Sequence, residues 1–254
     1  MTITILPDVT LRFILLFARI GTLVMLMPGL GEQSVPANIR LALALLLTLV
    51  FYPLAFDAFP SGLADDGLRL VQMVMREVIV GLAIGVLMRM MMALSQTAGA
   101  IIAQQAGLAF AQSVDPTMGQ QGAVFGSFLG MTGVTLIFLT DLHHVAIAGL
   151  AGSYRVFPPE GFMPIGDFSE LAVATVAGMF EVACQISAPF IVFGLVFHFA
   201  LGLLAKLMPQ LQVFFLAMPV TVFVGMMLFA LLIIAMTTSY LAHVEEGLMR
   251  LVPG

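Results

Sequence analysis

The sequence contains uncharged runs that are long enough to cross a lipid bilayer as helices. Residues 118–140 carry no charged side chain, and residues 207–244 form the longest uncharged run of the chain. A helix that spans the hydrocarbon core needs about 20 predominantly apolar residues, and both runs exceed that length. The whole pattern predicts about six helical segments, the others lying at residues 9–30, 41–56, 70–94 and 171–205.

Polar connectors and prolines divide these segments. Residues 57–69 and 141–170 gather acidic residues and prolines, and both are predicted to be connectors. Proline removes a backbone donor and clashes with the preceding helical turn. Pro189, Pro209 and Pro219 are therefore expected to interrupt the last two apolar segments.

The composition agrees with a membrane protein. Charged residues make up 9% of the chain and hydrophobic residues 61%, whereas soluble domains carry about 25% charged residues. No polar block is long enough to form a separate soluble domain, so we expect one all-α, polytopic membrane-type domain over residues 1–254. The net charge is −5 and Lys206 is the only lysine, which excludes a nucleic-acid-binding surface.

Charged residues also fall inside the apolar segments, namely Arg12, Arg19, Arg76, Glu77, Arg89 and Glu181. A charged side chain that faces hydrocarbon costs several kcal/mol, so these residues are expected to face protein or a water-filled cavity. Two interpretations stay open for the adjacent Arg76 and Glu77. They form either a buried structural pair or a contact between subunits.

Residues 96–122 differ from the rest of the chain because they are rich in amides and small side chains. They hold six of the eleven glutamines, and their only charge, Asp115, is followed by Pro116. Irregular backbone is tolerated at membrane depth only where it is buried in protein or lines a cavity. Neutral amides can line a path without binding either sign of charge. A path lining and an amide-rich connector between helices both fit this composition.

Asp141, His143 and His144 are the residues that most invite a metal-site interpretation. Adjacent residues on a helix point about 100° apart, so the two histidines are not expected to chelate one ion. A structural or interfacial role is favoured, and no metal or cofactor is predicted. The sequence also carries no nucleophile motif, phosphate-binding loop or paired carboxylates, so neither catalytic residues nor enzymatic activity is predicted.

Several groups of residues, in the same order along nearly the whole chain, resemble the FliR family of flagellar biosynthesis proteins and their injectisome counterparts. The strongest match runs from Gln105 to Pro116, with the sequence QAGLAFAQSVDP. The other matching groups are Arg19 with Pro28, Pro36 and Arg40; Arg76-Glu77 with Gly81 and Gly85; His143-His144 with Ser153, Tyr154 and Pro158; and Pro209-Gln210 with Val213, Phe214, Phe215 and Pro219.

The resemblance implies a fold of inclined helical hairpins, like a FliP-type unit fused to a FliQ-type unit. It implies a subunit of the flagellar type III protein export gate in the bacterial inner membrane, at the flagellar basal body. Unfolded flagellar subunits would pass through the channel that it helps to form. FliP-type and FliQ-type subunits and an FlhB-type protein would be its partners. An injectisome export subunit is the alternative within the same class.

By the same resemblance, the segment from Gly107 to Pro116 would plug the closed channel; its members are Gly107, Leu108, Ala109, Phe110, Ala111, Gln112, Ser113, Val114, Asp115 and Pro116. Arg76 and Glu77 are the candidate subunit-interface residues. A secondary transporter is the alternative from another class. Its two halves should show corresponding broken segments, and the sequence shows no such internal repeat.

Overall fold

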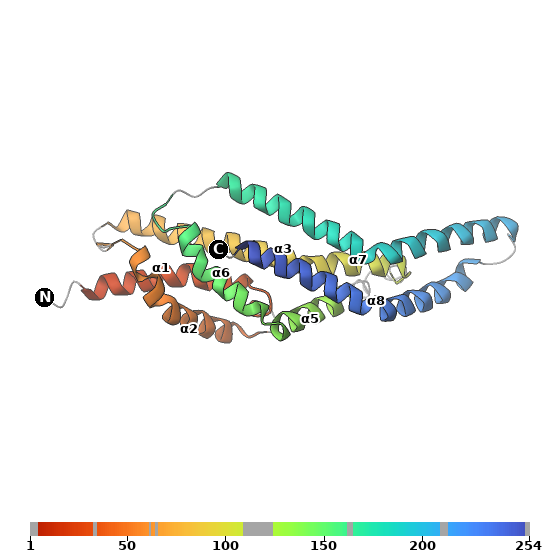
Figure 1. Cartoon of the computed structure of the whole chain (residues 1–254), viewed down its shortest axis with the longest axis horizontal. Coiled ribbons are helices and arrows are strands. Elements are labelled where there is room, and N and C mark those ends of the chain that lie inside the picture. The colour runs from red at the N-terminus through yellow and green to blue at the C-terminus, as the bar shows by residue number, and fades with distance from the viewer. Residues whose placement is uncertain are drawn as a thin grey trace. The chain divides into compact units, whose positions relative to one another are not determined.

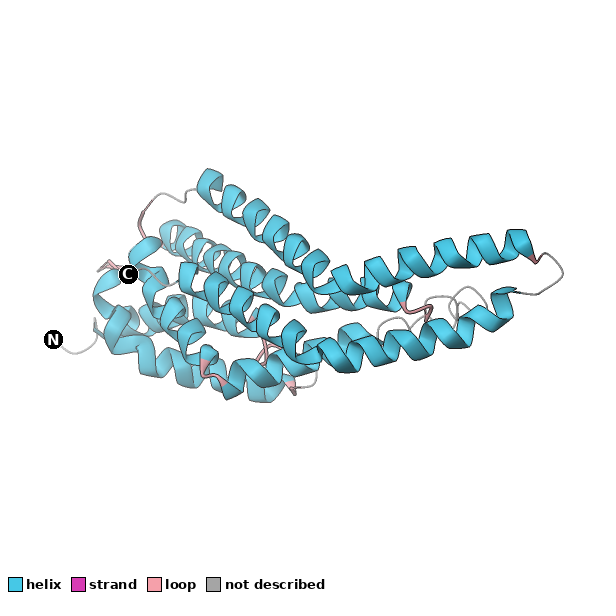
Figure 2. Cartoon of the chain, turned by 45° about the vertical axis from the view of Figure 1, so that its right-hand side comes forward, coloured by secondary structure: helices cyan, strands magenta, loops and turns pink. Residues whose placement is uncertain are grey.

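A computed structural model describes residues 5–32, 35–60, 62–63, 66–108, 124–161, 165–208 and 213–251. Every regular element within these ranges is helical (Figure 2). The all-α prediction is therefore confirmed.

The described part of the chain consists mainly of helices, several of them long (Figure 1). Five of them are long and apolar enough to cross a membrane, and a sixth span is added if α5 and α6, which meet at a bend of 76°, are taken as one. The prediction of about six segments is confirmed on these criteria. The elements are α1 (Ile5–Leu26), α2 (Ala37–Ala55), the 3-10 helix η1 (Phe56–Ala58), α3 (Gly67–Gln105), α5 (Val124–Leu139), α6 (Leu142–Val156), α7 (Ile165–Leu207) and α8 (Val213–Leu251).

The prediction of a connector over residues 141–170 is wrong, because α6 occupies Leu142–Val156. Its buried residues Leu142, Ala146, Leu150 and Tyr154 recur every four positions, a spacing that gives a helix one buried face. Prolines follow only after the helix has ended. The acidic residues and prolines that suggested a connector lie outside α6, at the two ends of the stretch.

Pro189 and Pro219 do not end the helices that contain them. Pro189 lies inside α7 and Pro219 inside α8, so the predicted interruptions are wrong at these two positions. Pro209 lies outside the described residues. In transmembrane helices, neighbouring groups and local adjustments satisfy the backbone carbonyls that a proline leaves free.

The chain divides into two compact units. Unit 1 comprises residues 1–91, 137–175 and 245–254, and unit 2 comprises residues 92–136 and 176–244. The single-domain organisation over residues 1–254 stays a prediction.

Unit 1 is built around α1, which runs beside α2 (Figures 1 and 2). Leu15, Leu16 and Ile20 of α1 are at most 1% exposed. Two glycines of α3 allow a close approach to α1: a methyl group on Gly81 would lie 2.6 Å from the Arg19 carbonyl oxygen, and one on Gly85 would lie 2.7 Å from Leu26 Cβ. Small residues four apart let two helix backbones pack closely.

Unit 2 contains the end of α3, most of α5, α7 from residue 176 to its end, and α8 from its beginning to residue 244. Within it, the later part of α7 and the early part of α8 run side by side (Figures 1 and 2). Glycines again permit close packing, since a methyl group on Gly99 of α3 would lie 2.8 Å from the Phe125 carbonyl carbon of α5. The rings of Phe125 and Phe229 lie 4.6 Å apart between α5 and α8.

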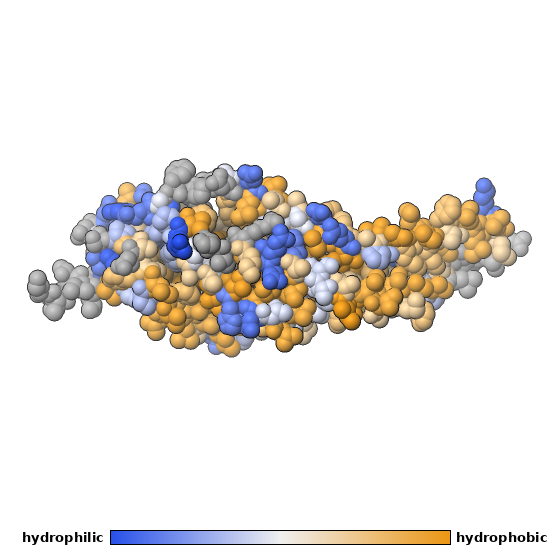
Figure 3. Space-filling view, viewed as in Figure 1, coloured by the Kyte–Doolittle hydropathy of each residue, from blue (hydrophilic) through white to orange (hydrophobic). Residues whose placement is uncertain are grey.

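On the face shown in Figure 3, the surface of the described helices is largely apolar. The chain itself buries 11% of the residues in the most apolar stretch of α7, compared with 50% in the corresponding stretch of α3. Leu195 and Phe199 of α7 are 73% and 70% exposed. Such contiguous apolar surface marks a membrane or protein contact.

Candidate functional site

The predicted plug begins where α3 ends. Gly107 has a φ of 75°, a left-handed conformation that glycine adopts without steric cost. The Leu108 amide donates to the Ala103 carbonyl at 3.1 Å and the Gly107 amide to the Gln104 carbonyl at 3.4 Å. This is the Schellman pattern that closes a helix C-terminus. Gly107 and Leu108 thus form the cap of α3, and the plug residues from Ala109 to Pro116 lie outside the described residues.

A groove of about 670 Å³ lies beside this helix end, within unit 2. Gln105 contributes an amide to it, and α7 contributes a mainly apolar wall. The side chain of Gln105 lies against Gly194, where an added methyl group would lie 3.0 Å from Gln105 Cδ. The groove therefore combines a neutral amide with apolar surface, its lining being Gln105, Ile191, Gly194, Leu195, Val196, His198 and Phe199.

A second feature is a buried ion pair in unit 1 between α1 and α3. Arg19 Nε donates to Glu77 Oε2 at 2.6 Å and Arg19 Nη2 to Glu77 Oε1 at 2.9 Å. Both side chains are 0% exposed. Two parallel charge-assisted bonds of this kind fix both position and orientation. Glu77 is therefore held inside unit 1 by a residue 58 positions away rather than by its neighbour Arg76.

The remaining donors of Arg19 bind α6 and the turn after it. Nη1 donates to the Ser153 carbonyl at 3.1 Å and Nη2 to the Phe157 carbonyl at 2.8 Å. The guanidinium carbon lies 4.0 Å from the centre of the Tyr154 ring, within the range of a cation–π contact. Three of the groups on which the family resemblance rests, around Arg19, Glu77 and Ser153-Tyr154, therefore meet at one guanidinium. The carbonyls of Ser153 and Phe157 could not be predicted as acceptors, because a backbone acceptor leaves no pattern of residue types.

Arg76 differs from Glu77 in its surroundings. It is half-buried, and its Nε and Nη2 atoms are buried without a hydrogen-bond partner among the described residues. A buried donor without an acceptor costs free energy, and neither of these two atoms has an acceptor within the described part of the chain. The role of Arg76 and Glu77 at a subunit interface stays a prediction.

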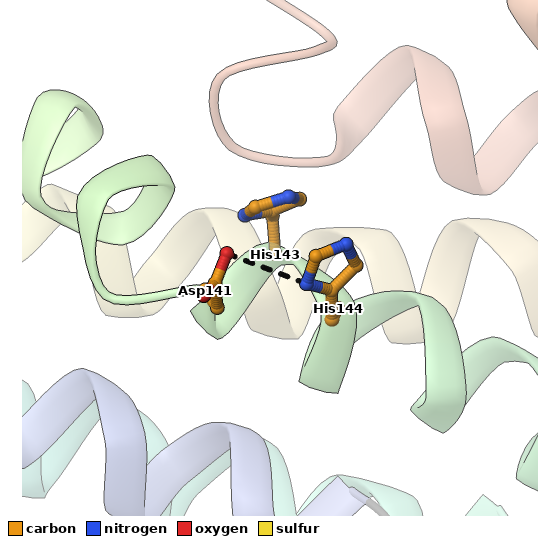
Figure 4. Close-up of side chains that lie close together, drawn as sticks. All are labelled: Asp141, His143 and His144. Atoms are coloured by element: carbon orange, nitrogen blue, oxygen red, sulfur yellow. Dashed lines mark ion pairs between the residues drawn. The ribbon is translucent and has the colours of Figure 1, made fainter.

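Asp141, His143 and His144 lie together where α5 gives way to α6 (Figure 4). Asp141 Oδ1 lies 3.5 Å from His144 Nδ1. The centres of the two histidine rings are 4.0 Å apart and the ring planes are inclined by 37°. The expectation that these adjacent side chains diverge is wrong, because both rings have turned toward each other at the first turn of α6.

Residues 10–247 match the profile of a protein family described as bacterial export proteins, family 1. The chain is 45% identical to the flagellar biosynthetic protein FliR of Caulobacter vibrioides over 85% of this chain and 86% of that relative. It is 30% identical to the flagellar biosynthetic protein FliR of Bacillus subtilis, over 92% and 89% of the two chains. It is also 25% identical to the Yop proteins translocation protein T of Yersinia pestis, over 94% and 90%.

Proposed function

Because the chain belongs to the bacterial export proteins, family 1, we propose that it is a structural subunit of the flagellar type III protein export gate. In this role it forms part of the channel through which unfolded flagellar subunits cross the bacterial inner membrane. The observation that carries the proposal is the correspondence with flagellar relatives along nearly the whole chain. The role requires passage of a polypeptide and no catalysis.

The flagellar assignment is favoured over the injectisome alternative. The relatives with the higher identities are named as flagellar biosynthetic proteins, and the translocation protein of Yersinia has a lower identity over a similar length. A secondary transporter is not favoured, because the family name describes protein export.

The proposed partners are FliP-type and FliQ-type subunits, together with an FlhB-type protein and the exported flagellar subunits. The support is the apolar surface of the long helices, which the chain itself covers only in part. Arg76 is the proposed polar contact, because its side chain is only half-buried and its Nε and Nη2 atoms have no acceptor among the described residues. Glu77 supports the same contact from inside, by fixing the α3 face that carries Arg76.

We further propose that the segment from Gly107 to Pro116 closes the resting channel. Its beginning is fixed by the cap at Gly107, so the segment leaves α3 at a defined place. Beyond the cap, its small and neutral side chains can exclude water without holding a passing chain by charge. Asp115 is the only charged member.

Co-expression with tagged partners tests the assignment. The full chain with an affinity tag is expected to co-purify with FliP-type and FliQ-type subunits from the inner-membrane fraction, in one large complex. An Arg76→Gln variant should give a lower yield of this complex, whereas Arg155→Gln, an exposed change at the end of α6, should not. Purification of the chain as a small homo-oligomer that transports a solute would contradict the gate assignment.

A further inference from the structure

We propose that Asp141, His143 and His144 form a binding site for one divalent transition-metal ion, with Zn²⁺ as its best-matched probe. Each residue offers one ligand atom, and the three atoms lie within 4.8 Å of one another. Figure 4 shows the carboxylate and both rings gathered at the start of α6. The proposal rests on this cluster and is independent of the export function.

The distances suit a first-row metal ion. Zinc binds imidazole nitrogen and carboxylate oxygen at about 2.0–2.2 Å, which places tetrahedral ligand atoms about 3.3–3.6 Å apart. Asp141 Oδ1 and His144 Nδ1 already lie 3.5 Å apart. Their side chains are 76% and 68% exposed, so they have the rotamer freedom to close on an ion.

The backbone around Asp141 explains why the three side chains converge. Asp141 has a φ of 60°, the one positive φ of a non-glycine residue among the described ranges. The His144 amide donates to the Asp141 carbonyl at 2.9 Å, which closes a turn and brings side chains three residues apart to the same side. A strained conformation of this kind persists only where its surroundings fix it, and such residues cluster at ligand-binding sites.

His143 supplies an observation that does not depend on the distances. Its Nδ1 atom is buried and has no hydrogen-bond partner within the described part of the chain. The centre of its ring lies 5.0 Å from that of Phe138 and 4.0 Å from that of His144. Because no hydrogen bond within the described residues occupies its Nδ1 atom, the His143 imidazole can serve as a metal ligand.

The kind of ligand selects the kind of ion. Two imidazoles and one carboxylate suit Zn²⁺ and its neighbours, whereas Mg²⁺ and Ca²⁺ prefer oxygen ligands alone. Three protein ligands leave a fourth position for water or for a donor from another molecule. A bound ion would join Asp141 to the first turn of α6 and so fix the turn that separates α5 from α6.

The test is a titration of the purified full chain with Zn²⁺ against a chromophoric chelator. The affinity tag must contain no histidine, because a histidine tag would itself bind the metal. We expect one Zn²⁺ ion per chain, and at least about tenfold weaker binding in Asp141→Asn and His144→Gln. His198→Gln is the matched control, because His198 lies in α7, where its ring binds the Gly194 carbonyl, and it should bind Zn²⁺ as tightly as the unaltered chain.

A second measurement on the unaltered chain keeps the result decisive if a variant fails to fold. With Co²⁺ in place of Zn²⁺, X-ray absorption counts the coordinated imidazoles. Two imidazoles would support the site, and one or none would overturn it. Absence of stoichiometric Zn²⁺ binding, or equal binding by the unaltered chain and well-folded Asp141→Asn and His144→Gln variants, would also overturn it.

Discussion

At the scale of single residues, the contacts of Arg19 explain how this charged side chain can be fully buried in a largely apolar chain. Its guanidinium meets a carboxylate, two backbone carbonyls and an aromatic ring. A buried charge is tolerated when every donor finds an acceptor. Arg19 meets this condition through segments that are far apart in sequence.

Glu77→Ala should therefore destabilise the folded chain strongly. Removing one partner of a buried pair leaves an uncompensated charge and costs about 3–5 kcal/mol. Arg69→Ala, which removes an exposed pair with Glu160, should cost about 1 kcal/mol or less. The midpoint of thermal unfolding in detergent measures both effects. If the two variants unfold at the same temperature, the pair is not the structural centre of unit 1.

Gly81→Ala tests the close approach of α1 and α3. The new methyl group would lie 2.6 Å from the Arg19 carbonyl oxygen, and overpacking of this kind costs about 1–3 kcal/mol. Gly202→Ala is the matched control, because a methyl group there meets nothing within 4 Å; it should leave stability unchanged or raise it by up to about 1 kcal/mol. Unfolding midpoints of the two variants are compared, and an unaffected Gly81→Ala would contradict this packing.

At the scale of elements, the apolar runs predicted the long helices, but their limits depended on other residues. The sequence places apolar helix only to residue 94, whereas α3 continues through the amides to Gln105. Amide side chains do not break a helix; a glycine cap at Gly107 does. Likewise, Asp141 and Pro158 are residue types typical of connectors, although the residues between them have the spacing of a helix with one buried face. The partner of Glu77 could not be predicted, because residues 58 positions apart share no local pattern.

The plug also belongs to this scale, because it is a segment joined to a helix cap. Deletion of residues 109–114 leaves Gly107 and Leu108 in place, so α3 should keep its end and the complex should assemble. Membrane conductance in cells that carry the assembled complex should then rise. The matched control replaces residues 109–114 with the same number of glycine and serine residues, which keeps the length and removes Phe110.

Complex yield and conductance are measured on the same preparation. Normal yield with unchanged conductance would contradict the plug, since a segment that closes the channel cannot be removed without a leak. If the deletion abolishes assembly, membrane conductance is measured instead with the Phe110→Ala variant, which changes one side chain of the segment and keeps its length.

At the scale of the whole molecule, the exposed apolar area of α7 and α8 predicts dependence on partners. These helices expose large side chains such as Leu195, Phe223 and Ile234, each more than 70% accessible. Expressed without FliP-type and FliQ-type subunits, the chain should be degraded or should aggregate, and co-expression should restore its level. Immunoblotting of membrane fractions measures this. A stable, monodisperse chain in the absence of partners would contradict assembly as its native state.

The contacts of Arg19 also impose an order on biogenesis. As α1 leaves the ribosome it carries a cation whose carboxylate partner is synthesised 58 residues later and whose Ser153 acceptor follows 134 residues later. A lone arginine in hydrocarbon costs several kcal/mol. If α1 crosses the membrane, we therefore expect it to become stable in lipid only after α3 has been synthesised and Glu77 has paired with Arg19. For this helix, membrane insertion and tertiary folding would then be coupled.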